Sequence, residues 1–134
     1  MRRIRVAHVI TRMCVGGAQE NTFHTVRLAN SDRYEVDLVS GRTARSEPSM
    51  ELSARDAGIE IVHVKHLVRN PSPLNDLRAY NELVRLFRER RYDIVHTHTS
   101  KAGYLGRMAA AKAGVPIVVH TPHRHSVFGY FRRL

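Results

Sequence analysis

Short apolar runs alternate with amphipathic stretches along almost the whole chain. The runs are rich in Val and Ile, which suits strands covered on both faces, and the stretches between them carry apolar residues at helical spacing. The expected strands are Ile4–Ile10, Tyr34–Ser40, Ile59–Lys65, Asp93–His98 and Pro116–Thr121. The expected helices are Gly17–Asn30, Ser49–Ala57, a helix from Pro73 to beyond Phe87, and Lys101–Ala113.

Glycine, serine and proline mark the ends of these elements. Ser72 and Pro73 have the residue types of a helix N-cap and first turn, whereas Gly58 and Gly114 would end the second and fourth helices. The buried side of the first helix should carry Phe23, Val26 and Leu28. The stripe on the third helix comprises Leu77, Tyr80, Leu83, Val84 and Phe87.

Strands that alternate with helices predict parallel βαβ units joined by right-handed crossovers. We therefore predict an α/β fold with three layers (α/β/α) and a parallel sheet in the order 3-2-1-4-5. The apolar run Ile117–Val119 should be a covered strand of that sheet. The topological switch point would then lie between the first and fourth strands, and ligands of open α/β sheets bind at such a point.

Polar and glycine-rich loops follow three of the expected strands. Gly16 and Gly17 follow the first strand and open a helix, where their backbone amides can approach a phosphate or a sugar. A tight turn without a ligand explains the two glycines equally well, and they do not form the dinucleotide pattern G-x-G-x-x-G. The other two loops carry histidines and small hydroxyl residues.

Four histidines end the fourth and fifth strands, at positions 96, 98, 120 and 123. They lack acidic partners, so we predict no metal site. His96 and His120 are interpreted as half-buried, hydrogen-bonded histidines, and His98 and His123 as the better ligand and catalytic candidates. Cys14, near the same edge, is interpreted as a small buried apolar residue rather than a nucleophile.

Composition narrows the class of protein. The 134 residues are enough for one domain, and the single cysteine excludes an internal disulfide and fits a reducing, cytoplasmic compartment. The net charge of +10 favours an anionic partner such as a phosphorylated substrate or an anionic membrane surface. The basic residues are scattered, Trp is absent and no nucleic-acid motif occurs, so we expect no specific nucleic-acid partner.

Several blocks together resemble the N-terminal half of a family 4 glycosyltransferase. The resemblance covers nearly the whole chain, and the order and spacing of the blocks make the joint match specific. The blocks are Val9-Ile10-Thr11, Gly16-Gly17-Ala18-Gln19, Asp93–Gly103, Gly106-Arg107, Ala109-Ala110, Gly114-Val115-Pro116 and His120-Thr121-Pro122-His123.

The resemblance implies a GT-B arrangement of two facing Rossmann-like domains. The first domain would bind a glycan or lipid-linked acceptor, and the second a nucleotide sugar, which is a co-substrate, so no cofactor is expected. Transfer would retain the anomeric configuration. The implied substrate-binding residues are Gly16, Gly17, His98, Thr99, Lys101 and His123.

Two departures from the family pattern affect the prediction. Arg124 follows His123 where the family usually has glycine, and the paired glutamates E-x7-E of the donor domain have no counterpart. We therefore expect residues 1–134 to form the N-terminal domain alone, inactive without a donor-binding C-terminal domain, with a poorly ordered or self-associating tail at 122–134. The alternative is a non-enzymatic interaction domain that forms homodimers. The expected location is cytoplasmic, at the inner face of the membrane.

Overall fold

The computed structural model describes residues 2–43 and 48–123. These residues form one five-stranded parallel sheet in the order β3-β2-β1-β4-β5, which confirms the predicted order. The strands are β1 (Ile4–Arg12), β2 (Tyr34–Gly41), β3 (Ile61–His63), β4 (Ile94–His98) and β5 (Ile117–Thr121). The β3 strand is shorter than the expected Ile59–Lys65 because only three residues pair with β2.

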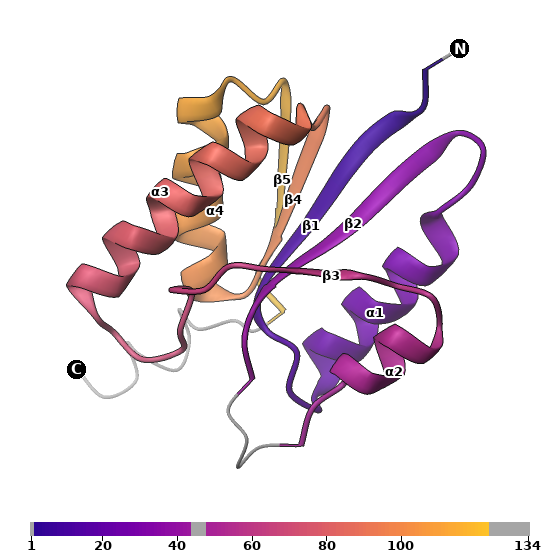
Figure 1. The fold of residues 1–134 in the computed structure, drawn as a ribbon, viewed down its shortest axis with the longest axis horizontal. Coiled ribbons are helices and arrows are strands. Elements are labelled where there is room, and N and C mark those ends of the chain that lie inside the picture. The colour runs from indigo at the N-terminus through magenta and orange to yellow at the C-terminus, as the bar shows by residue number, and fades with distance from the viewer. Residues whose placement is uncertain (1, 44–47, 124–134) are drawn as a thin grey trace.

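Helices cover both faces of the sheet, as expected for crossover connections (Figure 1). The helices are α1 (Gly17–Ala29), α2 (Glu51–Asp56), α3 (Pro73–Arg90) and α4 (Ser100–Ala113). The α3 and α4 helices lie together on one face, and α1 and α2 lie on the other. Gly114 ends α4 in the left-handed conformation with φ 77°, which confirms the prediction that it stops this helix.

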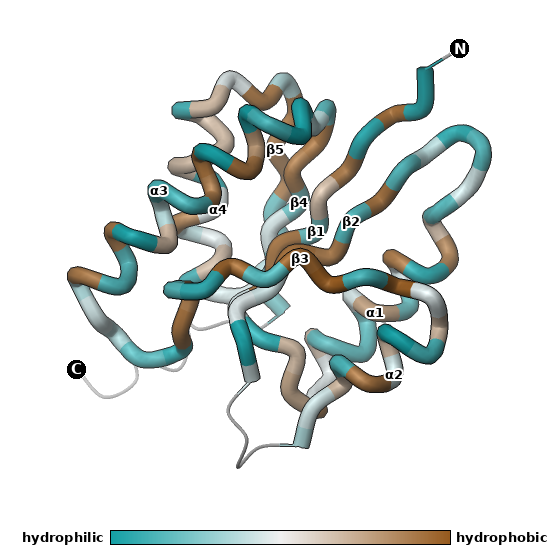
Figure 2. Tube along the Cα trace, in the orientation of Figure 1, coloured by the Kyte–Doolittle hydropathy of each residue, from teal (hydrophilic) through white to brown (hydrophobic). Residues whose placement is uncertain are grey.

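Two hydrophobic cores lie on the two faces of the sheet, and alternate residues of β1 enter different cores. Ala7 and Val9 pack with α3 and α4, whereas Val6 and Ile10 pack with Phe23 of α1. Figure 2 shows hydrophobic residues concentrated along the central strands. Because β1, β2, β3 and β4 each contribute to both cores, the sheet is the layer that fixes the positions of the helices.

Three of the burial predictions are wrong. Leu28 is 73% exposed and Leu77 is 57% exposed, although both lie on helices with correctly predicted apolar positions. The Ile117–Val119 run is also exposed, with Ile117 at 52%, because β5 ends the sheet and no described helix covers its outer part. An apolar run thus predicted a strand correctly but did not show whether both of its faces are covered.

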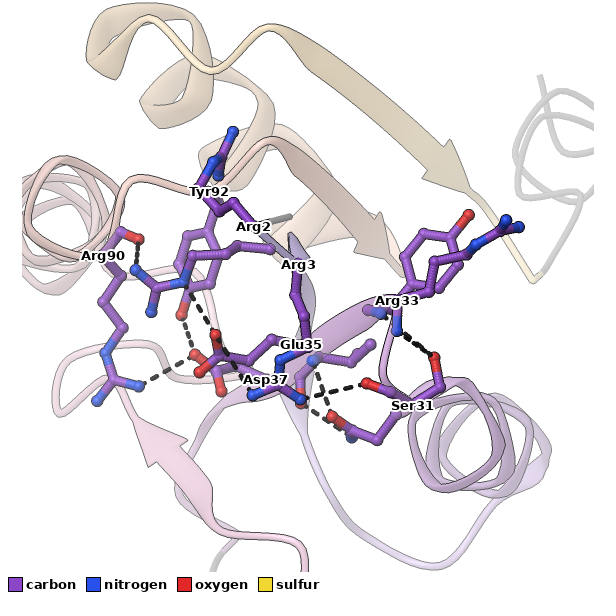
Figure 3. A network of polar contacts seen from close by, with 12 residues as sticks. Arg2, Arg3, Ser31, Arg33, Glu35, Asp37, Arg90 and Tyr92 are labelled. Atoms are coloured by element: carbon purple, nitrogen blue, oxygen red, sulfur yellow. Dashed lines mark hydrogen bonds and ion pairs between the residues drawn. The ribbon is translucent and has the colours of Figure 1, made fainter.

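Polar contacts tie β2 to the segment that joins α3 to β4, at the amino-terminal edge of the sheet. The Asp37 carboxylate accepts a hydrogen bond of 2.6 Å from the Tyr92 hydroxyl and one of 3.0 Å from Arg90 (Figure 3). Arg2 pairs with Asp93 at 2.9 Å, and the backbone N–H of Arg5 donates to the same carboxylate. This edge is therefore held by charged and hydrogen-bonded side chains rather than by apolar packing alone.

The α4 helix packs close to the sheet because two of its residues have no side chain. A Cβ on Gly106 would lie 2.6 Å from Cγ2 of Thr97, and a Cβ on Gly103 would lie 2.4 Å from Cε1 of His120. Real side-chain carbons do not approach other atoms so closely. The two glycines therefore set the distance between α4 and strands β4 and β5.

Residues 124–134 lie outside the described residues. The predictions about Arg124 and about the tail at 122–134 therefore stay predictions.

Candidate functional site

A cavity of about 1000 Å³ lies at the carboxyl ends of the strands. Its walls come from the loops after β1, β4 and β5 and from the first turns of three helices. This is the position at which open α/β sheets bind ligands. The lining residues are Thr11, Arg12, Cys14–Gln19, Arg69, Pro71, Asp76, Thr99–Lys101, Tyr104, Leu105, Pro122 and His123.

Five of the six predicted substrate-binding residues line this cavity: Gly16, Gly17, Thr99, Lys101 and His123. The sixth, His98, lies behind the wall with only 2% of its surface exposed. It reaches the cavity through His123, whose Nε2 is 2.7 Å from Nδ1 of His98. The structure thus gathers all six residues, and their role in binding stays a prediction.

Three helices direct their amino-terminal ends towards the cavity. Gly17 begins α1, Ser100 begins α4, and Asp76 lies in the first turn of α3; all three line the cavity. The unpaired N–H groups and the dipole of a helix start favour negative charge. A Cβ built on Gly17 would have no atom within 4 Å, so this glycine leaves open space beside the α1 amides.

Cationic side chains outnumber acidic ones in the cavity wall. Arg12, Arg69 and Lys101 contribute positive charge, and Asp76 contributes negative charge. Lys101 Nζ forms an ion pair with Asp76, 2.8 Å from its Oδ1, and donates to the Asn70 carbonyl. These contacts hold the Lys101 ammonium at the cavity wall.

The turn from β4 into α4 has an unusual backbone. Thr99 has φ 68° and ψ 178°, a combination that non-glycine residues rarely adopt. Its hydroxyl donates to the His98 carbonyl at 2.5 Å and lies 3.3 Å from the Thr11 hydroxyl. The Thr11 hydroxyl in turn accepts a hydrogen bond from the backbone N–H of Ala102. The end of β1 and the turn between β4 and α4 are therefore linked directly at the cavity wall.

The four histidines differ from the prediction in one respect. His96 and His120 are partly buried and hydrogen-bonded as expected, to the hydroxyls of Thr121 (2.7 Å) and Thr97 (2.9 Å). His98, however, is more buried than either, and its ring stacks on that of His8 in β1, with the centroids 5.1 Å apart. Burial, followed by the neighbouring histidines, lowers the pKa of His98 to about 3.

His8 is the principal residue that sequence reasoning missed. It lies in the middle of β1, is 4% exposed, and its Nδ1 is 2.8 Å from Nε2 of His98. Burial, followed by His96, lowers the pKa of His8 to about 4. The signal was available in the sequence, because a histidine at a strand position flanked by apolar residues must satisfy its ring nitrogens inside the protein.

Two further features of the cavity were mispredicted or missed. Cys14 is half-buried at the cavity wall rather than packed in a core. Arg69 and Tyr104 reach the cavity from a loop and a helix face that carried no recognisable motif. A cavity of this size, lined by amides, hydroxyls and cations, can bind a sugar that carries phosphate.

Comparison with known proteins identifies similar chains. A family model described as a glycosyl transferase 4-like domain matches residues 16–133. An Escherichia coli UDP-Gal:alpha-D-GlcNAc-diphosphoundecaprenol alpha-1,3-galactosyltransferase is 35% identical over 121 residues, which cover 90% of this chain and 30% of that enzyme. The chain therefore spans about a third of the length of this relative.

Solved structures share the fold at low sequence identity. MurG from Acinetobacter baumannii has a TM-score of 0.65 at 15% identity, covering 87% of this chain and 34% of that one. Sucrose-phosphate synthase from Thermosynechococcus elongatus also has a TM-score of 0.65 at 15% identity, covering 96% and 35%. At this identity the likeness concerns the fold alone, and it agrees with the Rossmann-like prediction.

Proposed function

We propose that this chain, which belongs to the glycosyl transferase 4-like domain family, is the acceptor-binding part of a retaining glycosyltransferase. The observation that carries the proposal is the cavity beside Gly17, Lys101 and His123, at the switch point of the sheet. The donor, a nucleotide sugar, would bind to a second domain of the complete enzyme. On this proposal residues 1–134 alone bind acceptor and do not transfer sugar.

The acceptor we propose is a sugar joined through diphosphate to a lipid. The Escherichia coli relative is named for such an acceptor, GlcNAc-diphosphoundecaprenol. In this chain, Arg12, Arg69 and the helix start at Gly17 would attract the phosphates. His123, which lines the same cavity, would hydrogen-bond a hydroxyl of the sugar.

A lipid-linked acceptor would bring the chain to a membrane surface. None of the helices in residues 2–43 and 48–123 has the length and apolar character of a bilayer-spanning segment. The net charge of +10 would favour peripheral contact with anionic headgroups. We propose the cytoplasmic face of the membrane as the place of this contact.

A Gly17→Val substitution tests the acceptor site. The added side chain meets no atom of the protein within 4 Å of its Cβ and should fill cavity space without disturbing the fold. We expect binding of a short-chain GlcNAc-diphosphoryl lipid, measured by isothermal titration calorimetry, to weaken at least about tenfold, the equivalent of roughly 1.4 kcal/mol. UDP-galactose alone should bind poorly to either form.

Asn21→Val is the matched control, because it places the same residue on an exposed position of α1 that does not line the cavity. It should bind the acceptor as the parent chain does. Equal affinity of the Gly17→Val form, with its fold intact by circular dichroism, would contradict acceptor binding at this loop. Tight binding of UDP-galactose that displaces the acceptor would instead assign the cavity to the donor.

A further inference from the structure

Three histidines from three parts of the chain form a continuous hydrogen-bonded row. His8 Nδ1 is 2.8 Å from His98 Nε2, and His98 Nδ1 is 2.7 Å from His123 Nε2. The row runs from the buried centre of the sheet to the cavity wall, because His8 is 4% exposed and His123 lines the cavity. His98, at 2% exposure, is the middle ring and uses both of its nitrogens within the row.

The row restricts where protons can lie. A neutral imidazole carries one N–H and one bare nitrogen, so His98 must donate to one neighbour and accept from the other. If His8 donates from Nδ1, then His98 also carries its proton on Nδ1, and so does His123 when its Nε2 accepts. In the opposite direction all three protons lie on Nε2. The geometry therefore requires the three neutral rings to share one tautomer.

The three rings remain neutral near pH 7, so the requirement for a common tautomer applies at that pH. Burial is the largest cause that lowers the pKa of each of the three histidines. The neighbouring histidines lower the pKa of His8 and His98 further, since a second positive charge close by is unfavourable.

A metal ion does not explain the arrangement. His8, His96 and His98 each offer a ring nitrogen within 4.8 Å of the others. However, the 2.8 Å between His8 and His98 is a hydrogen-bond distance. It is shorter than the roughly 3.3 Å expected between two nitrogens held 2.0–2.1 Å from a tetrahedral zinc ion. The group also contains no carboxylate to offset the charge of a cation.

We propose that His8 and His98 are positioning residues that act through His123. The hydrogen-bonded row fixes the orientation of the His123 ring and couples its tautomer to those of His8 and His98; one of the two directions of the row dominates and so sets the nitrogen that carries the His123 proton. Nδ1 of His123 hydrogen-bonds to no residue in the described part of the chain, so this atom is the one available to a ligand. A ligand in the cavity therefore meets one defined donor or one defined acceptor rather than a mixture of the two.

The consequence for sugar recognition rests on the proposed acceptor-binding function, whereas the row itself does not. The test is therefore a spectroscopic one on this chain, without any substrate. Two-bond proton–nitrogen NMR spectra of the histidine rings at pH 7.5 distinguish the two tautomers. We expect His8, His98 and His123 to be neutral and to show one common tautomer, with no mixture at His123.

Two substitutions at His98 test whether the whole row, rather than the contact between His98 and His123 alone, determines the tautomer of His123. His98→Asn retains a polar group near the position of Nδ1, facing His123, and His98→Gln retains one near Nε2, facing His8. We expect His123 to lose its single tautomer in both variants, because each breaks the row at one end. His96→Phe is the control, because it replaces a neighbouring imidazole outside the row by a ring without nitrogen and should leave the tautomer of His123 unchanged.

If NMR spectra of the unsubstituted chain show different tautomers among the three histidines, that result alone overturns the proposal. A single tautomer of His123 that survives in His98→Gln would overturn it as well. Neither result depends on sugar binding, so failure of this inference is distinguishable from failure of the proposed function. Conversely, a confirmed row in a chain that binds no acceptor would refute the proposed function alone.

Discussion

Buried neutral histidines are the unusual feature of this protein at the residue scale. His8 and His98 occupy the interior of a sheet where apolar residues would ordinarily pack. Their hydrogen bonds satisfy polar atoms that would otherwise cost free energy, but they offer no compensation for a positive charge. The free energy of unfolding should therefore depend on pH in the range where histidines ordinarily titrate.

We predict that the free energy of unfolding falls as the pH decreases from 6.5 to 5. The folded-state pKa values of about 4 for His8 and about 3 for His98 lie below the ordinary value of 6.5. In this range the unfolded chain binds protons that the folded chain does not, so stability is complete above pH 6.5 and is lost on acidification. The loss should be about 1.5 kcal/mol for each buried ring, and carboxylates, with ordinary pKa values near 4, contribute little.

Urea unfolding at several pH values measures this dependence. His8→Phe should reduce the loss between pH 6.5 and 5, because one titrating ring is removed. His24→Phe, at an exposed position of α1, should not reduce it. A free energy of unfolding that stays constant over this range would show that the two buried rings accept protons without penalty.

Site residues in the loops after strands were easier to predict from the sequence than site residues within strands. Gly16, Gly17 and His123 were found because a loop at the carboxyl end of a parallel strand has a known position. His8 was missed, and His98 was expected to be accessible, because burial of a strand residue depends on neighbours that are distant in sequence. The charged wall residues Arg12 and Arg69 were unpredictable for the same reason.

At the scale of elements, the seating of α4 against β4 is the contact most sensitive to volume. Gly106→Ala should place a methyl group against Cγ2 of the fully buried Thr97. Overpacking of this kind costs about 1–3 kcal/mol, and the better helix propensity of alanine offsets about 1 kcal/mol of it. We therefore expect a net destabilisation of about 1 kcal/mol in chemical denaturation.

Thr97→Ser supplies the internal control, because it removes Cγ2 and keeps the hydroxyl that hydrogen-bonds His120. In the Thr97→Ser background, Gly106→Ala should be neutral or stabilising. A double-mutant cycle with no coupling between the two positions would show that α4 moves away from the sheet at little cost.

Strand order and helix bounds were predictable because both follow from periodicity and connection rules. The predicted bounds of α1 and α4 differ from the observed ones by a single residue. The exposure of Leu28 and Leu77 was not predictable, since an apolar residue on a helix flank is buried only if a neighbour reaches it. The exposure of β5 likewise reflects what lies beside it rather than its own residues.

For the whole molecule, the outer part of β5 is the surface most suited to association. Ile117 and Val119 lie on one face of this last strand of the described sheet, at 52% and 41% exposure. An exposed apolar edge strand is prone to pair with another chain. This observation favours the alternative function, in which the chain is an interaction domain that forms homodimers.

We predict concentration-dependent dimerisation, detected by sedimentation velocity. Val119→Lys should raise the dimer dissociation constant at least about tenfold, because the strand edge would acquire a charge that resists desolvation. Leu28→Lys changes an apolar residue on α1 that is even more exposed, away from β5, and should leave association unchanged. A chain that is monomeric at high concentration would remove the support for the interaction domain.

The polar network at the amino-terminal edge of the sheet has a consequence for redesign of this protein. The contacts of Asp37 with Tyr92 and Arg90, and of Asp93 with Arg2, hold the strands at the end opposite the cavity. If the cavity binds the proposed acceptor, its preference should change when the loops at the carboxyl ends of β1 and β4 are exchanged while these contacts are kept. On the proposed function, these contacts and the loops that would bind the acceptor lie at opposite ends of the same strands, so loop variants can be made without altering the Asp37 and Asp93 contacts.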